Sequence, residues 1–247
     1  MTLDLAFVLV RTPQLPDPDA VIATAHTLGI AIEKAAIADN VLTLELAGTL
    51  PVLVSSMPAP HPDAPRMLGA RTSPKSDAVA TARAHFIIVP TGTLPGTAWQ
   101  RDTQLAKITA AVAANVDAVA AMLGSGRSFH RSDIFVKFAQ LSAESGELWD
   151  AELAIDIATA RESETRMAFL SHGMVRYGRE EFLITCPIQG AGARDFMMTM
   201  VRWMLDEPDK QLPTGDTVGR TADEKVRVRR VPNPMTKGPD VIRLDLP

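Results

Sequence analysis

The feature that most constrains this chain is a proline-rich segment, residues 58–76, which suits neither a helix nor the interior of a sheet. Proline fixes φ and lacks an N–H donor, and small, turn-forming residues fill the spaces between the prolines. These prolines are Pro58, Pro60, Pro62, Pro65 and Pro74. We therefore predict a loop or linker at 58–76, an N-terminal βαββ portion at 1–57 and a C-terminal α+β portion at 77–247. The pattern leaves open whether the whole chain folds as a single domain.

The N-terminal portion contains three expected strands and one expected helix. The run 3–10 is almost wholly apolar, which is typical of a buried strand. An Asp-Pro pair precedes an apolar helical face at 18–28, which predicts a helix with an aspartate N-cap. Leucines alternate with polar residues at 41–46, and a second short apolar run follows at 51–54. The predicted order is β-α-β-β.

The longest predicted helix lies in the C-terminal portion, at 97–123. Thr97 and Gln100 have the spacing of a capping box, apolar residues then recur at steps of three and four, and Gly124 follows. A strand at 85–89 precedes this helix. Ser132 is the expected N-cap of a further helix.

The rest of the chain reads mainly as sheet, with one Met-rich helix that ends near Pro208. Strands are predicted at 152–157, 166–175, 181–186, 226–228 and 242–246. Strands and helices in this order favour an α+β fold, with antiparallel or mixed sheets and helices packed on one face, arranged as two related β-α-β layers side by side.

Composition excludes several classes of protein. The 247 residues carry a formal net charge of −4, which argues against a general affinity for nucleic acid or anionic membranes. No apolar run approaches the roughly 20 residues that cross a bilayer. The single cysteine, Cys186, cannot form an intramolecular disulfide, which is typical of a cytoplasmic protein. The sequence leaves homo-oligomerisation and an unidentified protein partner open.

Two runs of alternating charge predict solvated strand faces. An acidic ladder and a basic ladder would each place same-face neighbours about 7 Å apart. They could bind a cation and phosphates respectively, pair with each other, or simply face water. The acidic ladder is Asp150, Glu152 and Asp156, and the basic ladder is Lys225, Arg227 and Arg229.

No motif in the sequence indicates a metal site, a cofactor site or a set of catalytic residues. The five histidines lack zinc-ligand spacing, so we expect neither metal nor cofactor. Cys186 shares strand phase with Phe182 and should point into the core, where a thiol is a poor nucleophile. A Cys186–His172 pair would require neighbouring strands and an orienting third group that the sequence does not show.

Several short stretches of the second half carry a family resemblance. They include 84–89, Trp149, 171–182, Gly215-Asp216-Thr217-Val218-Gly219 and 241–246. Over roughly 84–247 the chain resembles the bacterial domain-of-unknown-function family numbered 4261. That resemblance implies an intracellular bacterial protein and supplies no catalytic residues, because the family has no established activity.

The absence of a convergent catalytic set favours a non-catalytic, cytoplasmic protein-interaction module. The alternative is a small-ligand-binding protein or enzyme with a site in a cleft between the two halves. The residues that would form that site are His85, His172, Tyr177, Glu181 and Asp216. Asp216 also suits a tight bend between glycines, which is the more ordinary reason for such a sequence.

Overall fold

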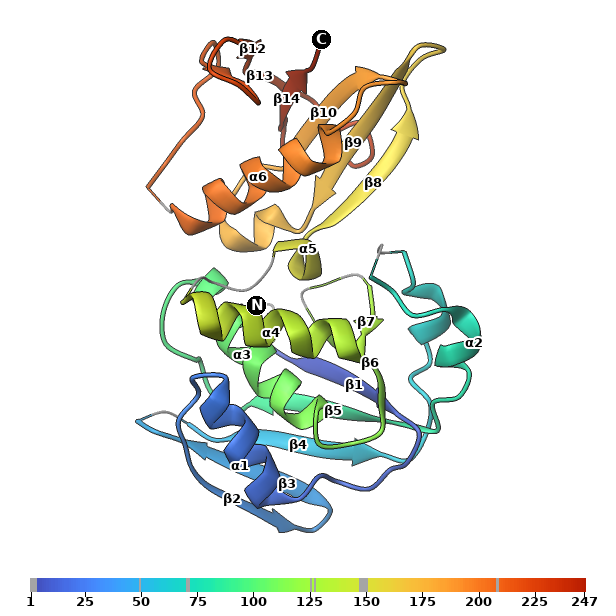
Figure 1. Cartoon of the computed structure of the whole chain (residues 1–247), viewed down its shortest axis with the longest axis vertical. Coiled ribbons are helices and arrows are strands. Elements are labelled where there is room, and N and C mark those ends of the chain that lie inside the picture. The colour runs from blue at the N-terminus through green and yellow to red at the C-terminus, as the bar shows by residue number, and fades with distance from the viewer. Residues whose placement is uncertain are drawn as a thin grey trace. The chain divides into compact units, whose positions relative to one another are not determined.

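The computed structural model has an α+β fold in two compact units, Met1–Ala154 and Ile155–Pro247 (Figure 1). It describes residues 4–48, 50–69, 72–124, 126, 128–146, 151–207 and 209–247. Each unit has its own sheet and its own helices, so each is described by itself.

The first unit is built on a seven-stranded antiparallel sheet with the order β2-β3-β4-β5-β1-β6-β7. The strands are β1 (Ala6–Val10), β2 (Ile32–Ala38), β3 (Val41–Leu46), β4 (Val52–Met57), β5 (Ala84–Pro90), β6 (Ala118–Leu123) and β7 (His130–Arg131). The helices are α1 (Pro18–Thr27), α2 (Ser76–Val79), α3 (Ala98–Ala113), α4 (Ser132–Ser145) and α5 (Ala151–Ala154), with a 3₁₀ turn η1 at Ala64–Arg66.

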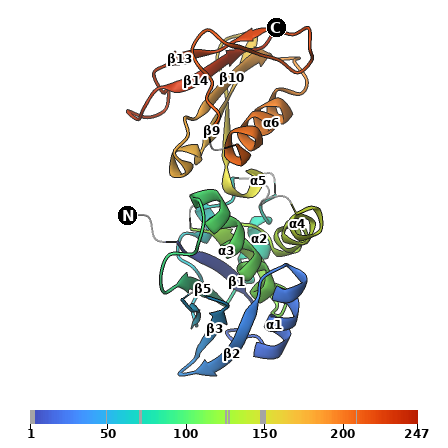
Figure 2. The ribbon, with the colours of Figure 1, turned by 90° about the vertical axis from the view of Figure 1, so that its left-hand side faces the viewer.

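Strand alternation divides the side chains of β1 between two faces of this sheet. Ala6, Val8 and Val10 are fully buried on the face that α1 and α3 cover. Figure 2 shows α1, α3 and α4 on the same side of the sheet. Phe7 and Leu9 point to the opposite face, where they join a second, smaller hydrophobic cluster.

The proline-rich segment contributes to that second cluster, so it is part of the first unit. Ala64, Met67 and Leu68 pack in the cluster that contains Leu9. Backbone hydrogen bonds also tie the segment to β7 and the residue before it. The N–H of Phe129 donates to the carbonyl of Met67 at 2.8 Å, and the N–H of Arg131 donates to the carbonyl of Thr72 at 2.9 Å. The division between the units falls at 154/155, not in this segment.

The helix predicted at 97–123 is wrong in its second half. The capping box of Thr97 and Gln100 is present and starts α3, but α3 ends at Ala113 and 118–123 forms the strand β6. Asn115 supports the turn between them, because its Nδ2 donates to the carbonyl of Ala111 at 2.8 Å. The alanines of this segment favour a helix, but β6 instead pairs with β1. In that position both faces of β6 are buried.

Two further details of the first unit differ from the sequence prediction. Strand β2 was absent from the predicted β-α-β-β order, and it forms a hairpin with β3 through Asp39 and Asn40, both at positive φ. The N-cap of α4 is Arg131, and Ser132 is the first helical residue. The Ser132 hydroxyl instead donates to the carbonyl of Ala118 at 2.7 Å.

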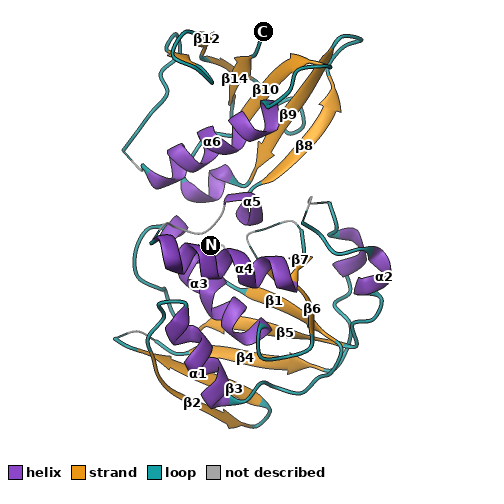
Figure 3. Cartoon of the chain, viewed as in Figure 1, coloured by secondary structure: helices purple, strands orange, loops and turns teal. Residues whose placement is uncertain are grey.

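The second unit contains a five-stranded mixed sheet with the order β13-β14-β10-β9-β8, of which Figure 3 labels β14, β10, β9 and β8. Strands β8, β9 and β10 form an antiparallel meander, and β14 pairs parallel with β10 and antiparallel with β13. The elements are β8 (Asp156–Arg161), β9 (Arg166–His172), the 3₁₀ turn η2 (Met174–Tyr177), β10 (Phe182–Pro187), α6 (Ala193–Asp206), β11 (Thr217–Val218), β12 (Val226–Arg227), β13 (Arg229–Val231) and β14 (Val241–Asp245).

Helix α6 covers β9 and β10 with a buried apolar stripe that includes Phe196, Met197 and Val201. In the part of the chain that the structure describes, no helix combines the length and the apolar character that crossing a bilayer requires.

Candidate functional site

The five residues predicted to share a ligand site are distributed over both units. His85 lies on β5 in the first unit. His172 ends β9, Tyr177 ends η2 and Glu181 directly precedes β10, so these three flank one connection in the second unit. Asp216 belongs to a different turn of that unit, just before β11.

Glu181 has a structural role in the β9–β10 connection. Its carboxylate is buried and accepts hydrogen bonds from the Ser171 hydroxyl at 2.6 Å and the Gly173 N–H at 2.8 Å. The Ser171 hydroxyl in turn accepts from the N–H of Phe182 at 2.8 Å. These bonds hold the turn η2 against the two strands, which accounts for a buried acid without a ligand.

His85 is buried in a ring cluster on the second face of the first sheet. Its Nδ1 donates to the carbonyl of Ala59 at 2.8 Å, because a carbonyl can only accept. Its ring lies 5.1 Å from that of His61 and 6.3 Å from that of Phe7. Burial lowers the pKa of His61, and the nearby His85 lowers it further.

The glycines beside Asp216 are explained by backbone geometry. Gly215 has φ +99°, which L side chains rarely adopt, and a Cβ on Gly219 would lie 2.1 Å from the carbonyl oxygen of Glu224. The backbone of Asp216 joins the turn, since its carbonyl accepts from the N–H of Val228 at 2.8 Å. This is the tight bend that the sequence also allowed.

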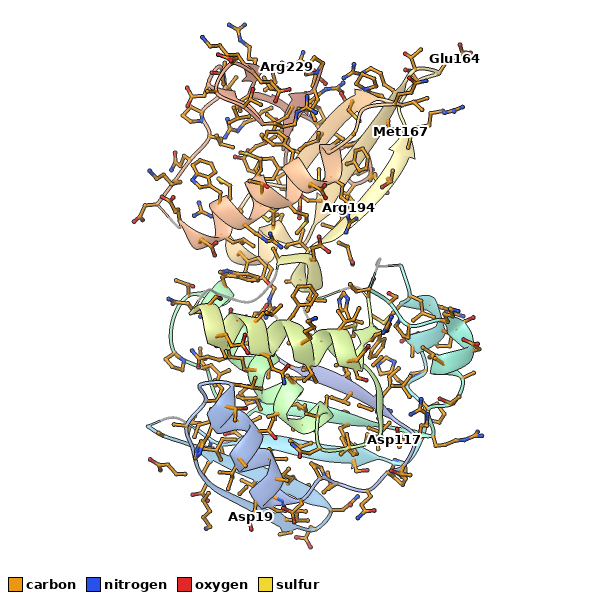
Figure 4. The ribbon with its side chains drawn as sticks, viewed as in Figure 1. Asp19, Asp117, Glu164, Met167, Arg194 and Arg229 are labelled. Atoms are coloured by element: carbon orange, nitrogen blue, oxygen red, sulfur yellow. The ribbon has the colours of Figure 1, made fainter. Side chains whose placement is uncertain are left out.

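Cys186 is buried, as its strand phase predicts. Its register partner on β9 is Met167, which Figure 4 labels, and His172 stands five positions further along that strand. At about 3.3 Å per residue the two lie roughly 17 Å apart, so the Cys186–His172 pair does not form.

The prediction that the acidic ladder lies on one face of a single strand is wrong. Glu152 lies in helix α5 of the first unit, whereas Asp156 begins β8 of the second. Asp150 lies outside the described residues. The segment around Leu153 is helical, so the apparent alternation at 152–157 crosses the boundary between two elements.

The basic ladder alternates in burial as predicted, but it does not lie on one strand, because Arg227 ends β12 and Arg229 begins β13, which belong to different sheets. Lys225, Arg227 and Arg229 are exposed, and the intervening Val226 and Val228 are buried. Arg229 pairs with Asp245 on the neighbouring strand, so at least this member meets an acid.

The sequence does not show that β8 is an edge strand whose outer backbone groups are open to a further strand. Each large sheet has two edge strands, and natural proteins usually blunt such edges. Three of these four edge strands have features that hinder pairing with a further strand. Strand β2 carries Glu33 and Lys34 beside a register shift. Strand β7 has only two residues, and β13 has three and is followed by Pro232. By contrast, β8 has six residues in regular register with β9.

The open backbone groups of β8 can be assigned from its pairing. Just beyond β8, the N–H of Glu162 donates to the carbonyl of Arg166, at 3.0 Å. Hydrogen-bonding direction alternates along a strand, so Ala158 and Ala160 also bond toward β9. The N–H and C=O groups of Ile157, Thr159 and Arg161 therefore point outward from the sheet.

A cavity of about 320 Å³ lies beside this edge. Its walls are largely apolar and come from β8, β9, β10, β14 and the stretch that precedes β14. They include Ala158, Ala160, Ala168, Leu170, Leu183 and Met235. Small alanine side chains on the edge strand leave room for apolar side chains of an added strand.

The charged residues that line the cavity are two arginines and one glutamate. Arg161 and Arg243 line it together with Glu162, and Arg243 pairs with Glu162 and Asp245. Arg161 is exposed and has no partner among the described residues. One guanidinium thus remains available beside the open edge.

No family model, no curated protein and no solved structure matches this chain. The resemblance to the family numbered 4261 therefore stays a prediction. Among the described residues, no three His, Cys, Asp or Glu side chains gather in a way that could hold a metal ion.

Proposed function

We propose that this protein is a protein-interaction module and that its second unit binds an extended, acidic segment of a partner as an added strand along β8. The observation that carries the proposal is the regular, unblunted edge of β8. An extended peptide gains main-chain hydrogen bonds at such an edge, and adjacent pockets select its side chains.

The chemistry of the edge defines the partner segment. Ala158 and Ala160 share the cavity with Leu170 and Leu183, which favours apolar residues at every second position of the partner. Arg161, which has no partner in the part of the chain that the structure describes, favours an acidic residue between these apolar residues. No aromatic side chain lines the described cavity, so stacking of nucleic-acid bases has no platform there.

The candidate ligand residues give less support to the alternative function. Glu181 is satisfied by Ser171 and Gly173, and the glycine beside Asp216 serves the backbone. The Nδ1 of His85 donates to the carbonyl of Ala59.

Substitution of Thr159 tests the proposal. Thr159→Pro removes an outward N–H without touching the bonds to β9, and proline is tolerated on that side of an edge strand. Thr159→Val retains the N–H and is the matched control. We would measure binding of a terminally blocked peptide of alternating Glu and Val by fluorescence anisotropy, and its footprint by amide hydrogen exchange.

We expect the peptide to protect the amides of Ile157, Thr159 and Arg161. The Thr159→Pro change should weaken binding about five-fold or more, as expected for a lost hydrogen bond of about 1 kcal/mol, and Thr159→Val should not. The same peptide with Lys in place of Glu should bind less well. Equal binding by both Thr159 variants, preference for a single-stranded oligonucleotide, or protection of these amides by self-association alone would contradict the proposal.

A further inference from the structure

The first unit contains a separate pocket that the interaction function does not use. It has a volume of about 320 Å³, at the small end of the range of about 300–1,000 Å³ for ligand pockets. Its floor is Leu9 of β1, and its walls come from the proline-rich segment and α2. The apolar wall residues include Pro60, Ala64, Pro65, Val79 and Ala82.

His61 forms one wall and is held in place by other rings. Its ring meets those of Phe7 at 4.9 Å, His85 at 5.1 Å and Phe129 at 5.5 Å, each edge to face. Its Nδ1 accepts from the N–H of Asp63 at 3.3 Å, so the neutral ring carries its proton on Nε2. The neutral His61 ring therefore has its hydrogen-bond donor at Nε2.

Two further polar groups line the pocket and are unused. The exposed Arg83 guanidinium and the Ser76 hydroxyl have no partner among the described residues. The backbone N–H of Arg83 donates to the carbonyl of Val10 at 2.9 Å, which fixes the start of its side chain beside β1. A planar guanidinium at the rim of an apolar pocket matches a carboxylate.

We propose that this pocket binds a small monocarboxylic acid with an apolar body. The body would occupy the space above Leu9, and the carboxylate would pair with Arg83 at the rim. The volume limits the ligand to a short aliphatic chain or a single ring. A single cation suits a monoanion better than a doubly charged phosphate.

Hexanoate is the probe, and 1-hexanol is its neutral counterpart. We would titrate each into the full chain and follow the chemical shifts of the His61 ring and the Val79 methyls. Arg83→Gln removes the guanidinium. Arg66→Gln is its matched control, because Arg66 is an exposed arginine of the same unit that does not line the pocket.

A second pair of variants tests occupancy of the pocket. Ala80→Trp adds a ring at Ala80, the exposed C-cap residue of α2, which lines the pocket. Ala23→Trp makes the same change at an exposed position of α1 and should leave binding intact.

We expect hexanoate to bind more tightly than 1-hexanol and to shift both sets of signals. Arg83→Gln should weaken hexanoate binding about ten-fold or more, as expected for a charged hydrogen bond. Ala80→Trp should abolish binding. The proposal fails if hexanoate causes no shift at millimolar concentration, if hexanol binds equally well, or if Arg83→Gln behaves as Arg66→Gln does.

Discussion

Neighbouring glutamates at 180 and 181 have opposite environments despite identical chemistry. Glu181 is buried under three backbone or hydroxyl donors, whereas Glu180 forms a half-exposed pair with Arg230 at 2.7 Å. Sequence identifies both as charged but cannot show which is buried, because the difference depends on how β9 and β10 align. This is why Glu181 could be chosen as a candidate site residue.

Alanine substitutions at these two positions should therefore differ in effect. Glu181→Ala leaves the Ser171 hydroxyl and the Gly173 N–H without their acceptor, so we expect a loss of about 2–4 kcal/mol in the free energy of unfolding. Glu180→Ala breaks only a surface pair and should cost about 1 kcal/mol or less. Urea denaturation of both variants measures the difference, and equal losses would refute the structural role of Glu181.

His130 is a second residue whose environment makes a measurable prediction. It is almost wholly buried, and Thr72 Oγ1 lies 2.6 Å from its Nδ1. Burial lowers its pKa from 6.5 to about 4. The unfolded chain therefore binds a proton at a higher pH than the folded chain does, so this contribution to stability is complete above pH 6.5 and is lost as the pH falls toward 4.

Between pH 7 and 5 this difference should lower the free energy of unfolding by about 2 kcal/mol. His130→Asn removes the titrating group, so its stability should vary less over the same range. Chemical denaturation at several pH values gives both curves. Parallel curves for the wild type and His130→Asn would show that His130 does not titrate as described.

At the scale of elements, the sequence predicted helices and strands best where a single local signal decides the structure. The α1 N-cap and the capping box of α3 depend on local contacts, and both are present. The alternating leucines of β3 were also identified, because a half-buried strand has a period of two. These signals need no knowledge of distant parts of the chain.

Strands that are buried on both faces or exposed on most of their length were harder to predict. Strand β6 is an apolar, alanine-rich run, and only Asn115 and Asp117 before it signalled the turn. Strand β2 is largely exposed, so it lacks clear alternation, and its only local signal was the Asp39-Asn40 pair, which suits a tight hairpin. Both segments become strands because they pair with neighbouring strands of the sheet.

The candidate sites were the least predictable elements. An open edge at β8 exists only because β9 pairs with its other side and no further strand follows it in the sheet. Likewise, the pocket beside His61 requires the proline-rich segment to fold over Leu9. Composition indicated that this segment lacks regular structure, but not that it packs against a sheet.

At the scale of the whole molecule, the chain forms two units, each with its own sheet. Because the two sheets differ in topology, the sequence shows no pattern that repeats from one unit to the other. The first sheet is wholly antiparallel, whereas the second gains one parallel pair through β14. The positions of the proposed strand-binding edge and the proposed carboxylate pocket in different units allow each to be altered without changing the residues of the other.

The interior position of β14 also bears on how the second unit would behave if its backbone were cut. Strand β14 lies between β10 and β13, and an exposed stretch at 232–240, which contains Lys237, leads into it. Trypsin cleavage after Lys237 should leave the short C-terminal piece bound, because Val241, Ile242 and Leu244 stay buried. The nicked protein would then separate into two fragments in denaturant yet remain one particle in native buffer, so the unit could be reassembled from a synthetic strand and its truncated remainder.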